Sequence, residues 1–255
     1  MLLNGKQEVI NLDVKPYDLI ALPNNQIMSL DYLEKSLTIY DQNLKLVKRI
    51  DRIGGGLFAP LAIFINLEEE IFYIADNQNN RILMTDFDFN LIKSIGSRGK
   101  ENDQFNGLYD LCLINQSLVV CDYENQRLQV YSKDLEFEKS INTFCEPFKI
   151  KTTSSLICIH SVGGIFFYYI DSFKLFKWFN HNFCKISKIN SNIYELDHRA
   201  KKLFCYDEKS NDFMQELTYS NEYLSVIWDG SMIVFNGTLL ITSYTKNKII
   251  KYSMQ

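Results

Sequence analysis

The sequence predicts an all-β fold made of repeated four-stranded antiparallel units, and two observations carry this prediction. The segment 71–96 consists of three short strand-like runs joined by polar turns, and the same pattern returns at 117–141. Short apolar runs bounded by such turns are typical of strands, and no run shows the spacing of an amphipathic helix. The runs are apolar on both faces, which indicates sheets buried between neighbouring sheets.

A single repeat organises the chain. Six windows of twelve residues align without gaps, at 30–41, 75–86, 121–132, 159–170, 196–207 and 242–253. Their second positions are Asp31, Asp76, Asp122, His160, Asp197 and Ser243, separated by 45, 46, 38, 37 and 46 residues. Nine residues later stand Tyr40, Thr85, Tyr131, Tyr169, Tyr206 and Tyr252. Repeats of about 40–45 residues are typical of β-propeller blades.

Each repeat is predicted to hold four strands, called a to d from the inside to the outside of a propeller. Pro16, Pro60 and Pro147, and Leu108 in the equivalent place, open strand a, where a missing N–H is tolerated. The strands of the second repeat are expected near 61–66, 70–75, 81–86 and 90–95.

The repeats together predict a single domain, 1–255, folded as a six-bladed β-propeller. The expected blades are 16–50, 58–96, 106–141, 147–179, 183–217 and 223–253, the last completed by the N-terminal segment 4–12. Pairing beside 248–252 would cover an open strand edge and close the ring.

Composition limits the range of functions. The net charge of −4 gives no general attraction to nucleic acid or acidic membranes. We expect neither a signal peptide nor a membrane helix, since no apolar run approaches about 20 residues. The six cysteines form no CxxC pair and several lie in apolar strands, so we expect buried thiols and a cytoplasmic location.

The repeats also carry a family resemblance. ADNQNNRI at 75–82 and CDYENQRLQVYS at 121–132 resemble the NHL repeat, and the segment 96–111 is similar to that family's glycine-rich loop between blades. The fourth repeat departs from it, with His160 and Ile165 in place of Asp and Arg. The resemblance, as in TRIM-NHL-type proteins, implies a six-bladed propeller. It does not imply one activity, because the fold serves protein binders, RNA binders and a few enzymes.

The Asp and Arg of the repeat, five residues apart, are predicted to hold the turn between strands b and c. They are Asp76 with Arg81 and Asp122 with Arg127. A carboxylate can accept N–H groups of a turn, and an arginine can bind the carboxylate.

The predicted binding face carries the b–c turns and the loops that join strand d to the next strand a. Its candidate residues are Arg52, Arg98, Lys100, Tyr109, Asp110, Lys149 and Lys185. We predict a non-catalytic recognition or scaffold propeller that binds a protein or peptide, as a monomeric domain or part of a larger assembly. Single-stranded RNA is the alternative partner, although acids on the same loops oppose phosphate binding.

A third alternative is a metal-dependent hydrolase or lyase centred on the channel. Lys149 and Lys185 would repel a cation there, and the three histidines, 160, 181 and 198, have no repeated spacing. No GxSxG motif or phosphate-binding glycine loop is present. We therefore predict no catalytic residue, metal or cofactor. The aromatic run 165–179 is expected to be buried between blades, with an exposed docking edge as the alternative.

Overall fold

The structure is a computed structural model of the chain. It describes residues 7–143, 145–179, 184–189, 192–197, 202–207, 212–218, 232–236, 238–243 and 248–253. Residue contacts divide the chain into two compact units, unit 1 with Met1–Asp51 and Ser187–Gln255, and unit 2 with Arg52–Ile186.

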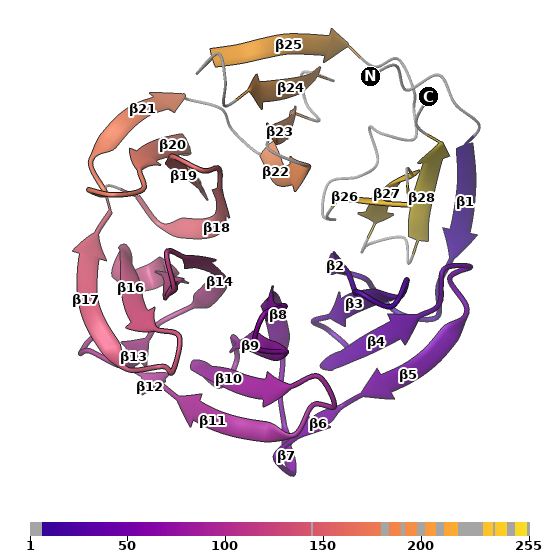
Figure 1. Ribbon diagram of the computed structural model, residues 1–255, viewed down its shortest axis with the longest axis horizontal. Helices are drawn as coiled ribbons and strands as arrows, with labels where there is room; N and C mark the ends of the chain where they lie inside the picture. The colour runs from indigo at the N-terminus through magenta and orange to yellow at the C-terminus, as the bar shows by residue number, and fades with distance from the viewer. Residues whose placement is uncertain are drawn as a thin grey trace. The chain divides into compact units, whose positions relative to one another are not determined.

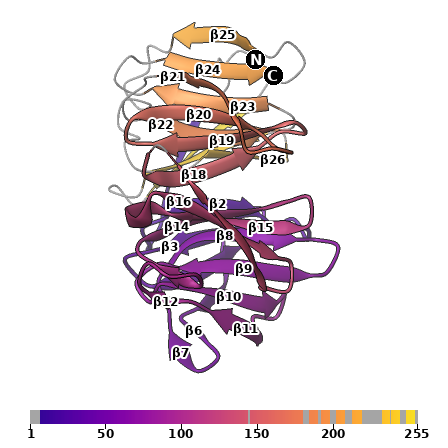
Figure 2. The ribbon, with the colours of Figure 1, turned by 90° about the vertical axis from the view of Figure 1, so that its left-hand side faces the viewer.

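Unit 2 contains three four-stranded antiparallel sheets (Figure 1). Their strands are β8 (Pro60–Asn66), β9 (Ile71–Asp76), β10 (Arg81–Asp86) and β11 (Leu91–Ile95); β14 (Leu108–Ile114), β15 (Ser117–Asp122), β16 (Arg127–Ser132) and β17 (Phe137–Asn142); and β18 (Pro147–Thr152), β19 (Leu156–Ser161), β20 (Gly164–Tyr169) and β21 (Leu175–Phe179). Strand β14 contacts both β8 and β18, so the first strands of the three sheets are neighbours. The sheet of β18–β21 stacks on that of β14–β17 (Figure 2).

Short strands and one short helix lie in the loops of unit 2. Strands β6 (Arg52–Ile53) and β7 (Gly56–Leu57) form a two-stranded hairpin, and β12 (Ser97–Arg98) pairs with β13 (Gln104–Phe105). A 3-10 helix, η1 (Tyr123–Asn125), forms the b–c turn between β15 and β16.

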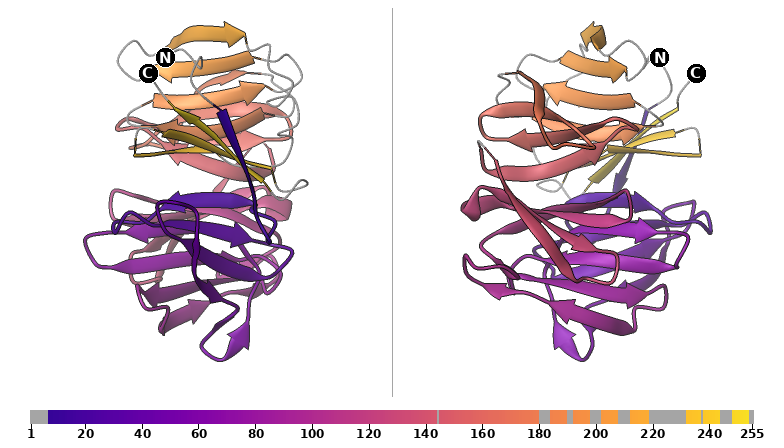
Figure 3. Two further views of the ribbon diagram at one scale, coloured as in Figure 1. Left: turned by 90° about the vertical axis from the view of Figure 1, so that its right-hand side faces the viewer. Right: turned by 60° about the vertical axis from the view of Figure 1, so that its left-hand side comes forward.

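Unit 1 contains one sheet near the N-terminus and one that joins the two ends of the chain. The first has β2 (Asp18–Ala21), β3 (Ile27–Asp31), β4 (Ser36–Tyr40) and β5 (Leu46–Ile50). The second has β26 (Met232–Phe235), β27 (Thr238–Ser243), β28 (Lys248–Ser253) and β1 (Gln7–Asn11). Strand β1 pairs antiparallel with β28, with Val9 opposite Ile250 (Figure 3). The predicted pairing of the N-terminal strand with 248–252 is therefore present.

One more four-stranded sheet begins at the boundary of the units. It has β22 (Cys184–Ile189), β23 (Asn192–Asp197), β24 (Lys202–Asp207) and β25 (Asp212–Thr218). The prediction of an all-β fold of four-stranded antiparallel blades is confirmed. The expected starts of the last two blades, near 183 and 223, lie outside the described residues.

The repeat in the sequence corresponds to a repeated register between strands b and c. In each window the second residue pairs with the residue five positions later: Asp31 with Ser36, Asp76 with Arg81, Asp122 with Arg127, His160 with Ile165, Asp197 with Lys202 and Ser243 with Lys248. Strands b and c are therefore paired in the same register in all six windows.

Buried side chains from adjacent sheets form the core. Tyr73 of β9, Leu118 of β15 and Tyr131 of β16 are all fully buried in one cluster that joins the first two sheets of unit 2. Cys121 and Ile157 belong to the next cluster, between the second and third sheets. The four described cysteine side chains, at 112, 121, 145 and 158, are buried and form no disulfide with one another, as expected from their apolar neighbours.

The aromatic run of the fourth repeat is divided between the core and the surface. Phe166, Phe167 and Tyr168 are buried. Tyr169 is 43% exposed and Trp178 is 52% exposed. Trp178 stacks on Phe166 from the outer strand β21, with ring centroids 5.9 Å apart. Strand c is therefore buried except at its last residue, Tyr169, whereas the outer strand exposes Trp178 to solvent. Among the described residues, no helix has the length and apolar character that crossing a bilayer demands.

Candidate functional site on the b–c turn face

Asp122 joins a b–c turn to the loop that precedes its own sheet. Its Oδ1 accepts the backbone N–H of Asn106 at 2.8 Å, and its Oδ2 accepts Arg127 Nε at 2.7 Å. Asn125 donates to both carboxylate oxygens. Arg127 also donates to the carbonyl of Gln104 at 2.9 Å, so the turn and the loop are held as one body.

The same network recurs around Asp76 in the preceding sheet. Asp76 is fully buried and accepts the N–H of Ala59 at 2.8 Å, Asn79 Nδ2 at 2.8 Å and Arg81 Nε at 2.7 Å. Arg81 donates onward to the carbonyl of Leu57 at 3.2 Å. Charge-assisted bonds of this kind offset the loss of hydration of a buried carboxylate. Both arrangements are called the Asp–Arg network below.

The first repeat keeps the aspartate and lacks the arginine. Asp31 is fully buried, and its carboxylate accepts the hydroxyls of Ser29 and Thr38, both at 2.5 Å. Ser36 stands where the second and third repeats have arginine, and its buried Oγ has no hydrogen-bond partner. Burial raises the pKa of Asp31 from 3.8 to about 6, because desolvation outweighs the two hydroxyl bonds and the more distant Arg49.

Two lysines of β18 approach a buried aspartate of β14. Lys149 Nζ lies 3.9 Å and Lys151 Nζ 3.8 Å from Asp110 Oδ2, which also accepts the N–H of Ile150 at 3.0 Å. The fully buried Cys121 is nearby: burial first, and then the charge of Asp110, raises the pKa of its thiol. Of this group the sequence pointed to Asp110 and Lys149. Lys151 was missed, although it lies two residues further along the same strand and therefore on the same face.

Two half-buried tyrosines lie at the start of strand a and on the b–c turn of the same sheet. The rings of Tyr109 and Tyr123 are 4.7 Å apart between centroids and tilted by 37°. Burial raises the pKa of Tyr123, and the carboxylates of Glu146 and Glu124 add to the effect. Gln126 Nε2 donates to Glu146 at 3.2 Å, which links this turn to the loop before β18.

The other candidate residues are spread over different loops. Arg52 lies on the β6–β7 hairpin, which Figure 1 places at the outer side of unit 2, and donates to the carbonyl of Gly55 at 3.3 Å. Arg98 and Lys100 are exposed on either side of Gly99, whose carbonyl accepts Asn125 Nδ2 at 2.9 Å. Lys185 lies in β22, and its side chain is outside the described part of the chain. The structure thus brings Asp110 and Lys149 together and leaves Arg52 apart from them.

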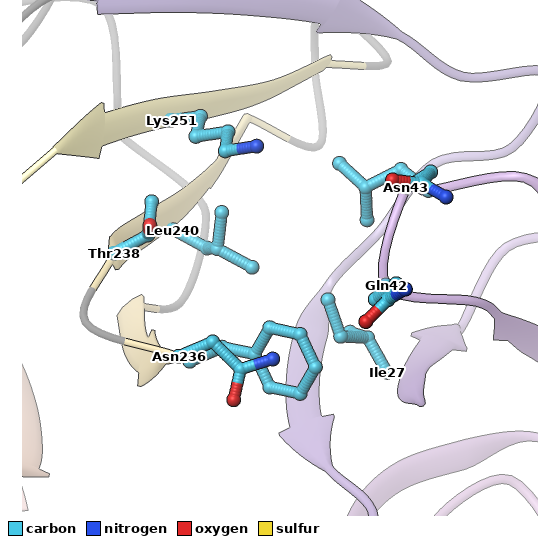
Figure 4. A pocket seen from close by; sticks show the side chains of 9 residues that line it. Ile27, Gln42, Asn43, Asn236, Thr238, Leu240 and Lys251 are labelled. Carbon is cyan, nitrogen blue, oxygen red and sulfur yellow. The ribbon is translucent and has the colours of Figure 1, made fainter. Parts of the chain in front are cut away.

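Two pockets occur in unit 1, and none of the candidate residues lines them. One, of about 230 Å³, lies between the turn after β4 and the sheet of β26–β28 (Figure 4). Its polar lining includes Gln42, Asn43, Asn236 and Lys251. The other, of about 310 Å³, lies beside β4 and β5. Where side chains are described, no three His, Cys, Asp or Glu residues gather in a way that could hold a metal ion.

Stacked four-stranded sheets with their first strands adjacent define the class as a β-propeller, and solved structures support it. A streptogramin B lyase matches with a TM-score of 0.68 at 11% identity, covering 98% of each chain. A catalytically inactive virginiamycin B lyase from Staphylococcus aureus with quinupristin matches at 0.69 and 13% identity, covering 98% of this chain and 89% of the other. The WD40 β-propeller domain of Doa1 matches at 0.61 and 10% identity, covering 98% and 96%.

At sequence identities this low, the structural similarity shows a shared fold and nothing more. No family model matches the chain, so the resemblance to the NHL repeat stays an interpretation of its motifs. No curated protein matches the sequence either.

Proposed function

We propose that this chain is a closed six-bladed propeller of NHL type that recognises a protein or peptide partner without catalysis. The partner binds the face of the b–c turns and d–a loops. The identical register of the six windows supports the blade number, and the β1–β28 pairing supports closure. Buried free thiols support a cytoplasmic location.

The observation that carries the proposal is the Asp–Arg network. It fixes the b–c turns of the second and third repeats to the preceding loops through a buried carboxylate, as Asp122 does with Arg127 and the N–H of Asn106. Loops held in this way are already ordered before a partner arrives, which lowers the entropy that binding must overcome. The Tyr109–Tyr123 pair lies on this fixed part, and tyrosine is enriched among residues that dominate binding energy.

The charges around the tyrosines favour a polypeptide over RNA. Arg98 and Lys100 are exposed, but Glu101, Asp103 and Glu124 are exposed on the same loops. Phosphate contacts dominate the affinity for nucleic acid, so a surface of mixed sign binds it weakly. Mixed charges around aromatic rings are common in protein interfaces.

The test is a selection of displayed random peptides, with a random single-stranded RNA pool measured in parallel at low salt. We expect enriched peptides that lose at least about tenfold in affinity for Tyr109→Ala, since a central aromatic contact contributes about 2 kcal/mol or more. Tyr169→Ala is the matched control, because Tyr169 is exposed at the end of strand c, on the opposite face. Salt-sensitive RNA binding that Arg98→Gln with Lys100→Gln removes, without peptide enrichment, would overturn the proposal.

A further inference from the structure

A pocket of about 310 Å³ opens in unit 1 between the segment joining β1 to β2 and the strands β4 and β5. It lies at the seam where the sheet of β1 and β26–β28 packs on the sheet of β2–β5, since Val14, Tyr40 and Leu240 share one core cluster. None of the residues of the proposed recognition face lines it. The pocket is therefore a separate feature of the molecule.

A smaller residue lines the pocket at the place where two other repeats have phenylalanine. Phe105 is fully buried and packs against Tyr131 at 6.2 Å between ring centroids. The following residue, Asn106, donates its N–H to the repeat aspartate. Phe58 precedes Ala59, which makes the same bond in the second repeat.

In the first repeat the equivalent residue is Val14, two positions before Pro16 as Phe58 is before Pro60. Tyr40 is the counterpart of Tyr131 in the aligned windows. Val14 is buried beside Tyr40 but lacks a ring. No phenyl group therefore packs on Tyr40 from this position, and both Val14 and Tyr40 line the pocket.

The polar wall of the pocket carries one acid and one base. Asp13 and Arg49 both line it, and both act electrostatically on Tyr40: after burial, the charge of Asp13 contributes to raising the pKa of Tyr40 and that of Arg49 lowers it. Thr38 also lines the pocket; its hydroxyl donates to Asp31 and interacts with the side chain of Tyr40.

Arg49 has one further ionic contact, with Glu34 at 3.7 Å, and both side chains are nearly half exposed. An exposed pair of this kind contributes little, so the guanidinium can turn to a ligand. The apolar part of the wall consists of Leu12, Val14, Leu44 and Leu46, and the polar Asn11 also lines the pocket.

We propose that this pocket binds the zwitterion of a free α-amino acid with an aliphatic side chain. Arg49 binds the α-carboxylate, and Asp13 binds the α-ammonium. The aliphatic side chain packs against the four apolar residues. The volume of about 310 Å³ lies at the lower end of small-molecule sites, which suits a ligand of this size.

The test is isothermal titration calorimetry of the full chain with L-leucine at pH 7.5, beside 4-methylpentanoate and isoamylamine. These two probes keep the leucine side chain and each removes one charged group. We expect saturable leucine binding and at least about tenfold weaker binding of each probe, since one lost ionic contact is a tenfold change or more. Equal affinity for 4-methylpentanoate would show a plain anion site, and absent leucine binding would refute the pocket as a site. Either result overturns the proposal.

A variant of the chain tests whether leucine binds in this pocket. Val14→Phe places there the residue of the neighbouring repeats, so we expect it to abolish leucine binding while raising Tm. Val162→Phe is the matched control, because Val162 is 59% exposed and lies in unit 2; it should leave binding unchanged. Undiminished binding to a folded Val14→Phe protein contradicts the proposal. If that variant does not fold, Asp13→Asn must weaken leucine binding at least about tenfold and leave 4-methylpentanoate binding unchanged.

Discussion

The buried aspartate of the first repeat makes folding stability depend on pH in a predictable direction. Asp31 has no exposed surface, and its pKa is raised from 3.8 to about 6 chiefly by burial. A raised pKa in the folded state means that the protonated acid is favoured there. Its stabilising contribution is complete below pH 3.8 and is lost as the pH rises through about 6.

The size of the effect follows from the pKa. The difference between 3.8 and about 6 corresponds to about 3 kcal/mol of destabilisation once Asp31 is ionised. Asn has nearly the same shape and can keep one hydroxyl bond as acceptor. We therefore expect Asp31→Asn to stabilise the protein by about 1–3 kcal/mol at pH 7.5 and by much less at pH 4.5.

Urea denaturation of wild type and Asp31→Asn at both pH values measures this difference. Asp122→Asn is the matched control: Asp122 occupies the same repeat position but neutralises the buried Arg127. We expect it to destabilise by about 3–5 kcal/mol at pH 7.5, because a buried guanidinium loses its charged partner. A destabilising Asp31→Asn at pH 7.5, or a stability difference that is the same at both pH values, would refute the reasoning.

Three further predictions concern the fold. Arg127→Ala should destabilise by about 3 kcal/mol and Arg81→Ala by about 1 kcal/mol in urea, because their side chains are 10% and 28% exposed; equal losses would contradict this. Deletion of residues 1–11 removes β1 and exposes the edge of β28. Tm should therefore fall, and light scattering should show aggregation. An unchanged Tm would contradict the pairing of β1 with β28. Gly96→Ala should destabilise the protein more than Gly55→Ala. Both glycines have positive φ, but a Cβ at Gly96 lies 2.7 Å from Phe105, whereas a Cβ at Gly55 meets nothing within 4 Å. The urea midpoints of the two variants measure the difference, and equal midpoints would contradict the prediction.

Much of the fold could be predicted because the repeated residues act locally, within a single turn. An aspartate that ends strand b and a residue that opens strand c five positions later fix the turn, and the strands between turns leave little freedom of register. The N-terminal strand could be placed because β28 would otherwise keep an open edge. The apolar character of the fourth repeat could not show which of its aromatic side chains are exposed. Strand c and the outer strand β21 are both rich in aromatic residues, and they differ in their position in the sheet.

The candidate site was harder to predict because it depends on contacts between repeats. Asn79 and Asn125 stand three residues after their aspartates, and this spacing was a signal that could have added them to the network. The tyrosine partner of Tyr109 was not apparent, because Tyr123 comes from a turn that only the register of β14 and β15 brings near. The pocket beside Tyr40 is lined by residues from the segment before β2 and from β4 and β5, which come together only when the chain is folded.

The central claim, recognition through the b–c turn face, is tested most directly by hydrogen–deuterium exchange of the propeller with a selected peptide. We expect protection at 97–107, 123–126 and 143–148, the loops around the two tyrosines. Protection confined to the opposite turns, at 67–70, 115–116 and 133–136, would contradict it.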